Sequence, residues 1–187
     1  PDGDAIGSAV ALTHIAQRNG AEARILLGTG LPDFLSWLPL PAPTVKNLKE
    51  LGGWTPDLLL LADCGEINRA EPDLAAVLAG KDLPGPDWKN LVVANLDHHV
   101  SNIGYGHLNW VEPSRSATGE LAGLLAEHMG IPLSGELGEA VYLALVADTG
   151  NFSFANTGPD CLAMAARFGA GRPDNTEFTS KYEHSRN

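Results

Sequence analysis

Two short apolar runs of the sequence each end in residues that could do chemistry. One leucine-rich run ends at Asp63, and a second run ends at Asp97, His98 and His99. Both runs are typical of buried strands of a parallel sheet, and ligand sites in such sheets gather at the carboxyl ends of the strands. We therefore expect these side chains to lie close together, although they are far apart in the sequence.

Three further carboxylates lie at the ends of predicted helices. Asp2 and Asp4 come at the start of the first helix, and Asp148 comes at the end of another. The helix macrodipole disfavours a carboxylate at a helix C-terminus. A nearby cation would reverse that penalty at Asp148.

Aspartate oxygens with one or two imidazoles suit Mn²⁺ or Mg²⁺ better than Zn²⁺ or copper. Two such ions a few ångströms apart clamp a phosphate and activate a water. An ordinary alternative stays open for each carboxylate: Asp2 and Asp4 as helix N-caps, Asp63 as a turn residue and Asp148 as part of a helix-end turn. The histidine pair behind an aspartate is harder to explain in this way. The joint occurrence of these groups at element ends favours a metal site over a purely structural domain.

Short β-type runs alternate with helical ones, which predicts an α/β domain with a parallel sheet and flanking helices. Strands are expected over residues 23–27, 57–62 and 91–96, the last two buried on both faces. Helices are expected over residues 5–18, 71–79, 116 or 118–128 with Ser116 or Thr118 as cap, 134–148 with Ser134 as cap, and from Thr157 onward. Capping-box spacing at residues 174–177 predicts a polar final helix.

Composition bounds the class of protein. The 187 residues carry 12 basic and 23 acidic side chains, a net charge of −11, which argues against binding long duplex nucleic acid through a basic face. Bound divalent cations would still allow acidic substrates. The longest apolar runs are too short to span a membrane. Cys64 and Cys161 form no disulfide framework, and free thiols favour a cytoplasmic location.

Four segments together resemble the motifs of the DHH phosphoesterase family, in the family's order. They are Pro1-Asp2-Gly3-Asp4-Ala5-Ile6-Gly7-Ser8, Ala62-Asp63-Cys64-Gly65, Asp97-His98-His99 with Val100-Ser101-Asn102, and Ala147-Asp148-Thr149-Gly150. The stretches 113–120, with Ser116-Ala117-Thr118-Gly119-Glu120, and 152–157 resemble the nanoRNase and pAp phosphatase branch. The resemblance implies an α/β catalytic domain with a site for two manganese ions.

The resemblance also implies a role for each site residue. Asp2 would bind the first metal and Asp4 the second, and Asp63 would bridge both. His98 and Asp148 would complete the second site. In the same scheme His99 would lie beside the scissile phosphate, and Asp97 would orient the histidine pair by hydrogen bonds. The cofactor expected is Mn²⁺, as two ions, with Mg²⁺ as an alternative.

The substrates implied are short oligoribonucleotides and 3′-phosphoadenosine 5′-phosphate (pAp). Cyclic dinucleotides or their linear products, pyrophosphate, polyphosphate, and a degenerate nucleotide-binding module remain alternatives. The family's first motif carries a histidine a few residues before the position of Asp2, and we expect it to precede Pro1 in a longer protein. We also expect residues 1–173 to be the catalytic domain and residues 174–187 to lead toward a C-terminal DHHA1 substrate domain outside this chain. A homodimer is possible within this scheme.

A few other residues carry weaker expectations. Cys64 is predicted to be a small buried core residue, and Asn102 to help hold the histidines. Gly3 and Gly7 are expected where the backbone is closely approached. Arg69, Arg115 and Lys181 are weak candidates for phosphate contact, and His14, His107, His128 and His184 are not expected in the site.

Overall fold

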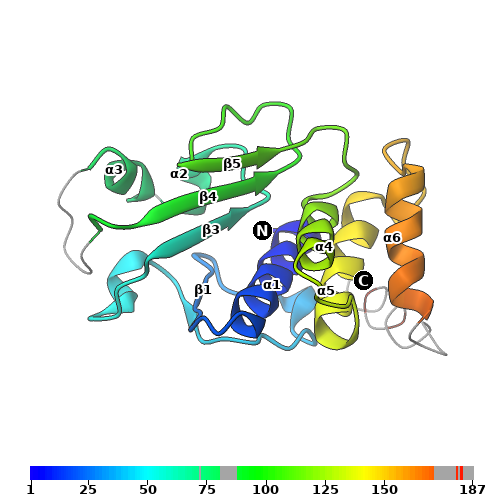
Figure 1. Cartoon of the computed structure of the whole chain (residues 1–187), viewed down its shortest axis with the longest axis horizontal. Helices are drawn as coiled ribbons and strands as arrows, with labels where there is room; N and C mark the ends of the chain where they lie inside the picture. Colours follow the sequence, from blue (N-terminus) through cyan, green and yellow to red (C-terminus); the bar gives the residue numbers. More distant parts are fainter. Residues whose placement is uncertain (72, 81–87, 171–179, 181, 183–187) are drawn as a thin grey trace.

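A parallel three-stranded sheet, with helices packed along one face toward the carboxyl ends of its strands, positions the site (Figure 1). The computed structural model describes residues 1–71, 73–80, 88–170, 180 and 182. Its strands are β1 (Ile25–Leu26), β2 (Thr44–Val45), β3 (Leu58–Ala62), β4 (Val92–Asp97) and β5 (Leu108–Val111). Its helices are α1 (Gly3–Arg18), η1 (Asp33–Leu35), η2 (Leu48–Leu51), α2 (Ile67–Ala70), α3 (Leu74–Leu78), α4 (Thr118–His128), α5 (Gly135–Asp148) and α6 (Pro159–Ala170).

All strands of the main sheet run in the same direction, in the order β3–β4–β5. The register places Leu60 opposite Ala94, and Ala94 opposite Leu108. A second, two-stranded parallel sheet joins β1 and β2. The predicted α/β class with a parallel sheet is therefore confirmed, while β2 and β5 are strands that the sequence pattern did not indicate.

Strand β4 lies at the centre of the sheet and is buried on both faces, as predicted. Val93 packs into an apolar cluster with Leu61 and Leu74, whereas Leu96 faces the larger cluster formed with α1, α4 and α5. The same prediction is wrong for β3. This strand lies at the edge of the main sheet, and Leu58 at its start is 46% exposed. A run of leucines alone does not distinguish a central strand from an edge strand.

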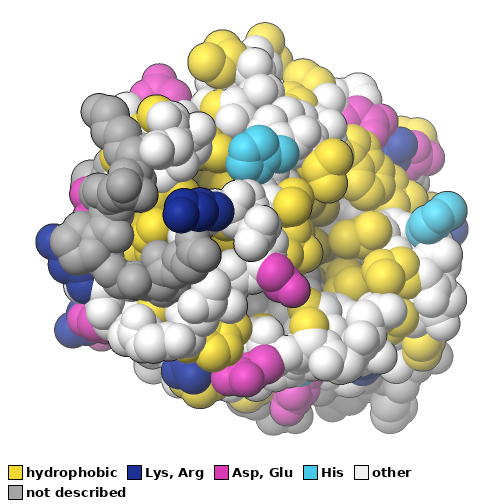
Figure 2. Space-filling view, turned by 60° about the vertical axis from the view of Figure 1, so that its left-hand side comes forward, with side chains coloured by type: hydrophobic (Ala, Val, Ile, Leu, Met, Phe, Trp, Pro, Cys, Tyr) yellow, Lys and Arg dark blue, Asp and Glu magenta, His cyan; other side chains and the backbone are white. Residues whose placement is uncertain are grey.

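The amino ends of the three strands extend beyond the helices. Leu58, Val92 and Leu108 all face solvent there. Figure 2, in which the left-hand side of Figure 1 comes forward, shows hydrophobic side chains gathered over part of this face. The opposite, carboxyl ends of the strands lie near the start of α1, where the N-terminus is marked in Figure 1.

Helices α1 and α4 both pack closely on α5, and glycines allow this. A Cβ atom on Gly7 would lie 2.5 Å from the carbonyl oxygen of Ala140, and one on Gly119 would lie 2.2 Å from the Cβ of Ala144. Neither position has room for a side chain. The close packing draws the first turns of α1 and α4 toward the last turn of α5, where Asp148 lies.

The helix starts are partly as predicted. The side chain of Asp2 caps α1 by accepting the N–H groups of Asp4 and Ala5, both at 3.1 Å. Ser134 occupies the N-cap position of α5, and α6 begins at Pro159. The prediction for α4 is wrong, because its N-cap residue is Ala117 and no local side chain caps it. The carboxylate of Asp4, from α1, supplies the missing acceptor.

Several predictions lie outside the described residues. They are the polar helix opening at residues 174–177, the domain boundary at 173/174, Lys181 and His184. In the part of the chain that the structure describes, no helix is both long enough and apolar enough to cross a membrane.

Candidate metal centre

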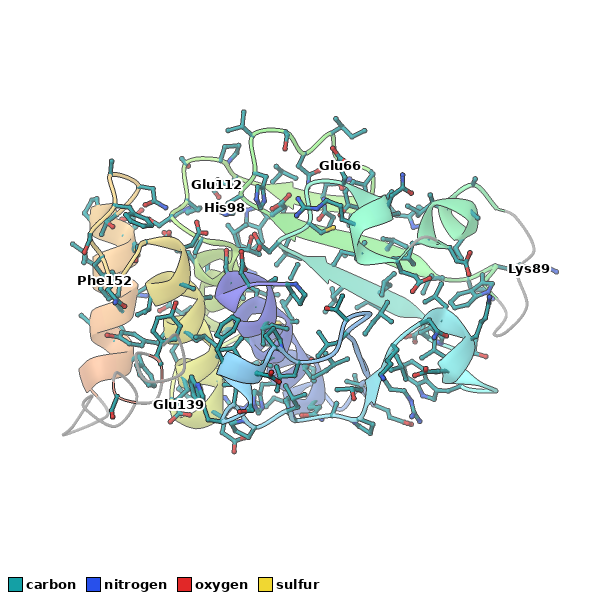
Figure 3. The ribbon with its side chains drawn as sticks, turned by 180° about the vertical axis from the view of Figure 1, so that it is seen from behind. Glu66, Lys89, His98, Glu112, Glu139 and Phe152 are labelled. Atoms are coloured by element: carbon teal, nitrogen blue, oxygen red, sulfur yellow. The ribbon has the colours of Figure 1, made fainter. Side chains whose placement is uncertain are left out.

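The Nε2 atom of His98 faces three carboxylates that come from three different elements. It lies 3.7 Å from Oδ2 of Asp4, 3.6 Å from Oδ1 of Asp63 and 3.5 Å from Oδ2 of Asp148. Asp4 is in the first turn of α1, Asp63 follows β3, and Asp148 is the last residue of α5. Figure 3 shows His98 where the strands of the main sheet meet the start of α1.

A backbone carbonyl fixes the ring of His98. Its Nδ1 lies 3.2 Å from the carbonyl oxygen of Arg115, which can only accept a hydrogen bond. Nδ1 therefore carries the proton in the neutral ring, and Nε2 presents a lone pair to the three carboxylates. This is the tautomer that a metal ligand requires.

His99 turns its Nδ1 atom toward the carboxylates, whereas His98 turns its Nε2 atom toward them. Its Nδ1 lies 2.7 Å from Oδ1 of Asp97 and 3.6 Å from Oδ1 of Asp63, and its side chain is 40% exposed. Burial lowers the pKa of His99, but the hydrogen bond and charge of Asp97, with the charges of Asp63 and Asp148, raise it above its ordinary value. The ring is thus biased toward the protonated form, in which Nε2 can donate a hydrogen bond.

Asp97 is completely buried and its carboxylate holds the histidine segment. Oδ1 accepts the backbone N–H groups of His98 and His99 as well as the ring of His99. Oδ2 accepts the side-chain amide of Asn102, which also reaches the carbonyl of Cys64. Asn102 thus holds Asp97, and through it the histidines, which agrees with the expectation from the sequence. Cys64 is buried, also as predicted.

Asp4 links α1 to α4. It is fully buried, and its two oxygens accept the N–H of Thr118 at 2.7 Å and the N–H of Gly119 at 2.9 Å. The hydroxyl of Ser8 donates a third bond to it at 2.9 Å. The carboxylate therefore satisfies two of the orphan N–H groups at the start of α4, where the helix dipole also favours negative charge.

Asp63 adopts a left-handed backbone conformation directly after β3, with φ of 55°. Such a conformation is uncommon outside glycine, and aspartate tolerates it better than most residues. The turn ends β3 and directs the carboxylate toward the histidines. Its Oδ1 accepts the hydroxyl of Thr118 at 3.1 Å.

Asp2 lies beside this cluster. With Asp148, Gly3, Phe34, Ala147 and Tyr182 it lines a hollow next to the start of α1. Its Oδ1 is occupied by the N-cap bonds of α1. Asp2 is close enough to Asp63 and Asp148 for its charge to raise the pKa of each carboxyl. Asp2 is not part of the compact groups that Asp4, Asp63, Asp148 and the two histidines form.

Burial raises the pKa of Asp4, Asp63 and Asp148; the charge of Asp2 adds to the rise at Asp63 and Asp148, and the two histidines oppose it there. For Asp4 the repulsion comes from Asp63 and Asp148, and bonds from α4 only partly offset it. Without a cation, several buried negative charges thus lie together at a cost.

The donors fit a divalent cation. Among the described residues, one group of Asp63, His98 and His99 and a second group of Asp4, His98 and Asp148 each bring ligand atoms within 4.8 Å of one another. Carboxylate oxygens with an imidazole nitrogen suit Mn²⁺ or Mg²⁺. The shared His98, and Asp63 close to it, place the two groups side by side.

The residues that hold the cluster were mostly not identified from the sequence. Thr118, Gly119 and Ser8 bond the carboxylates, and the carbonyl of Arg115 bonds His98. Arg115, Thr118 and Gly119 belong to the stretch 113–120. The resemblance of this stretch to one branch of the family was the sequence signal that could have pointed to them. The side chain of Arg115 is not open to phosphate, because it pairs with Glu112, Glu120 and Asp160.

Among the residues that the structure describes, the other histidines, His14, His107 and His128, lie outside the cluster, as expected. His14 lies on α1 near Glu136, and Nδ1 of His107 accepts the N–H of Val93. His128 is the last residue of α4.

Comparison with known proteins identifies the family. A model of the DHH family, N-terminal domain, matches residues 1–145. The chain belongs to the DHH family. Its site residues 2, 4, 63 and 97–99 all lie within the matched region.

Curated relatives of this DHH chain are described as bifunctional oligoribonuclease and PAP phosphatase NrnA. One from Thermus thermophilus is 34% identical over 166 residues, which cover 89% of this chain and 46% of the relative. One from Bacillus subtilis is 32% identical over 170 residues, which cover 88% of this chain and 48% of the relative. The chain thus spans about half the length of the curated relatives it matches.

Solved structures support the fold. An exopolyphosphatase-related protein from Bacteroides fragilis superposes with a TM-score of 0.82 at 24% identity, covering 98% of this DHH chain and 54% of the other. A putative family II inorganic pyrophosphatase from Methanococcus jannaschii superposes with a TM-score of 0.65 at 19% identity, covering 100% of this chain and 59% of the other.

Proposed function

We propose that this chain is the catalytic part of a phosphoesterase that uses two divalent cations to hydrolyse short oligoribonucleotides and pAp. The observation that carries the proposal is the position of His98 Nε2, which lies 3.5–3.7 Å from the oxygens of Asp4, Asp63 and Asp148. An imidazole nitrogen among three carboxylates has the composition of a hard divalent-metal site.

The residues proposed to hold the cations follow the family scheme. Asp2 serves the first ion, Asp4, His98 and Asp148 serve the second, and Asp63 serves both. Mn²⁺ is the proposed ion, with Mg²⁺ as the alternative. When bound, the cations would polarise the phosphate and lower the pKa of a water.

His99 and Asp97 have separate roles in the proposal. The bond from Asp97 holds the Nδ1 side of the His99 ring, which leaves Nε2 toward the substrate. The raised pKa of His99 favours the protonated ring, which carries a proton at Nε2. It would donate this proton to a phosphate or leaving-group oxygen. Asp97 acts through the histidines and contacts no substrate.

The substrate class rests on the relatives and on charge. The NrnA proteins of Thermus thermophilus and Bacillus subtilis are described as acting on oligoribonucleotides and PAP. A net charge of −11 favours a short substrate held by cations over a long duplex held by a basic surface. The division at residue 173, a C-terminal substrate domain, a homodimer and a cytoplasmic location belong to the same proposal.

The entire gene product tests the proposed activity. We expect it to release mononucleotides from a diribonucleotide and phosphate from pAp when Mn²⁺ is added, and to lose both activities with EDTA. Pyrophosphate, polyphosphate and a cyclic dinucleotide serve as competing substrates. Faster hydrolysis of one of these would overturn the substrate class, and tight nucleotide binding without any hydrolysis would favour a degenerate binding module.

The chain of residues 1–187 provides a second comparison. We expect it to hydrolyse pAp and diribonucleotides more slowly than the entire gene product, because the proposed substrate domain lies outside it. Equal turnover by the two proteins would remove the need for that domain.

A further inference from the structure

The segment from Arg115 to Glu120 contacts the candidate metal centre at several points. The carbonyl of Arg115 accepts from His98, and the N–H groups of Thr118 and Gly119 donate to Asp4. This concentration of contacts makes the segment a frame for the ligands, although none of its side chains belongs to either donor group.

One buried side chain organises the start of this segment. The side chain of Glu120 is only 2% exposed, yet both of its oxygens are bonded. Oε1 accepts Nη1 of Arg115 at 2.8 Å, and Oε2 accepts the backbone N–H of Ser116 at 3.0 Å. A buried carboxylate is costly unless it is paired and hydrogen-bonded in this way.

The N–H of Ser116 and the carbonyl of Arg115 are the two ends of one peptide group. Because the peptide is planar and trans, its N–H and C=O point in opposite directions. An N–H fixed on Glu120 therefore aims the carbonyl away from Glu120, and the structure has this carbonyl 3.2 Å from Nδ1 of His98. The charged carboxylate of Glu120 at the N–H end also makes the carbonyl of Arg115 a stronger acceptor, since hydrogen bonds in a chain polarise one another.

We propose that Glu120 is a positioning residue that holds His98 in its Nδ1–H tautomer through the peptide group between Arg115 and Ser116. The inference rests on the proposed function only in one respect, namely that Nε2 of His98 binds a metal ion. The tautomer itself is a property of the metal-free chain. Loss of Glu120 would let the peptide rotate, and Nε2 would then take the proton and bond to a carboxylate.

A purely structural role for Glu120 predicts something different. Its loss would then lower stability while leaving the His98 ring in the same tautomer. Glu127 offers a matched control, because it lies on the same helix and its carboxylate pairs with Arg167. Asp160 offers a second control, since it is the solvent-exposed partner of Arg115, 77% exposed at its side chain.

The test measures the tautomer by ¹⁵N NMR of the histidine rings in metal-free protein at about pH 8, where an ordinary imidazole is neutral. We expect the Nδ1–H form at His98 in the wild type and in Glu127→Gln and Asp160→Asn. We expect a substantial Nε2–H population in Glu120→Gln, whose neutral amide polarises the peptide less. Glu120→Asp, with a shorter side chain that withdraws the carboxylate from Ser116, is the second variant and is expected to shift in the same direction.

Mn²⁺ affinity, followed by electron paramagnetic resonance of the free ion, is the second readout. We expect Glu120→Gln to weaken binding roughly 10-fold, at the lower end of the range for outer-shell partners of metal ligands. An unchanged His98 tautomer in a folded Glu120 variant would overturn the inference, whatever the Mn²⁺ affinity of that variant. If the wild type binds no Mn²⁺, the proposed function fails, and the tautomer still decides the role of Glu120.

Discussion

The carboxylate of Asp4 accepts the backbone N–H of Thr118 at 2.7 Å, so a candidate metal ligand at the start of α1 also closes the start of α4. The same carboxylate accepts the N–H of Gly119. Ligand geometry and helix packing are thus joined in one side chain. Substitutions at Asp4 should separate these two roles. The amide of asparagine retains an oxygen that can accept an N–H of α4, whereas the methyl group of alanine retains no acceptor.

We expect Asp4→Ala to lower the free energy of unfolding of the metal-free protein by about 1–2 kcal/mol, the usual cost of losing a helix cap. Asp4→Asn keeps one acceptor for α4, turns an NH2 group toward the other N–H, and removes one charge that repels Asp63 and Asp148. It should cost less metal-free stability than Asp4→Ala while still weakening Mn²⁺ binding. Urea unfolding with and without Mn²⁺ measures both effects. Equal stability loss in the two variants would contradict the dual role.

Removal of Asp63 tests the shared ligand. We expect Asp63→Ala in the entire gene product to abolish Mn²⁺-dependent hydrolysis of pAp, a larger loss than the roughly 10–100-fold typical of outer-shell changes. Asp33→Ala is the control, because Asp33 is an exposed aspartate of η1, outside both donor groups. Full activity of Asp63→Ala would rule out the assignment of Asp63 to both cations.

The raised pKa values of Asp4, Asp63 and Asp148 give a defined pH dependence. The folded state binds these protons more tightly than the unfolded state, so metal-free stability falls as pH rises above about 4 through the raised pKa values. Cations compete with the same protons, so their stabilising effect grows with pH. We therefore expect the increase in Tm caused by Mn²⁺ to be larger at about pH 8 than at about pH 5.5. A smaller increase at the higher pH would contradict this reading of the cluster.

Close packing of α1 on α5 can be tested at Gly7. A methyl group there would meet the carbonyl of Ala140 at 2.5 Å, so Gly7→Ala should destabilise the protein by roughly 1–3 kcal/mol, as overpacking does. Gly53→Ala is the matched control, because nothing lies within 4 Å of its added Cβ. Denaturant unfolding of the two variants gives the comparison, and equal stabilities would refute the close-approach argument.

Much of the fold could be predicted because local signals agreed with it. The apolar pattern after Asp2 gave α1, and the valine-containing run before Asp97 gave β4. Strand β5 was missed because its first residues, Leu108 and Asn109, are exposed and show no clear alternation of apolar and polar side chains.

The start of α4 shows why the rest needed the structure. Ser116 and Thr118 have the right chemistry for a local cap, yet Ala117 is the N-cap residue. The acceptor for the first N–H groups of the helix is instead Asp4, far away in the sequence, while Glu120 inside the helix bonds the N–H of Ser116 just before it. Long-range pairing of this kind leaves no periodic pattern, so the residues that hold the carboxylates and histidines could not be predicted, although the gathering of Asp4, Asp63, His98, His99 and Asp148 at element ends could.

The central claim is that His98 and the carboxylates around it bind a divalent cation. The most direct measurement is the Mn²⁺ affinity of this chain, followed by electron paramagnetic resonance, for the wild type, His98→Ala and His128→Ala. The account predicts saturable binding in the wild type and in His128→Ala, and a loss of at least about 10-fold in His98→Ala. Equal affinity in all three proteins would contradict it.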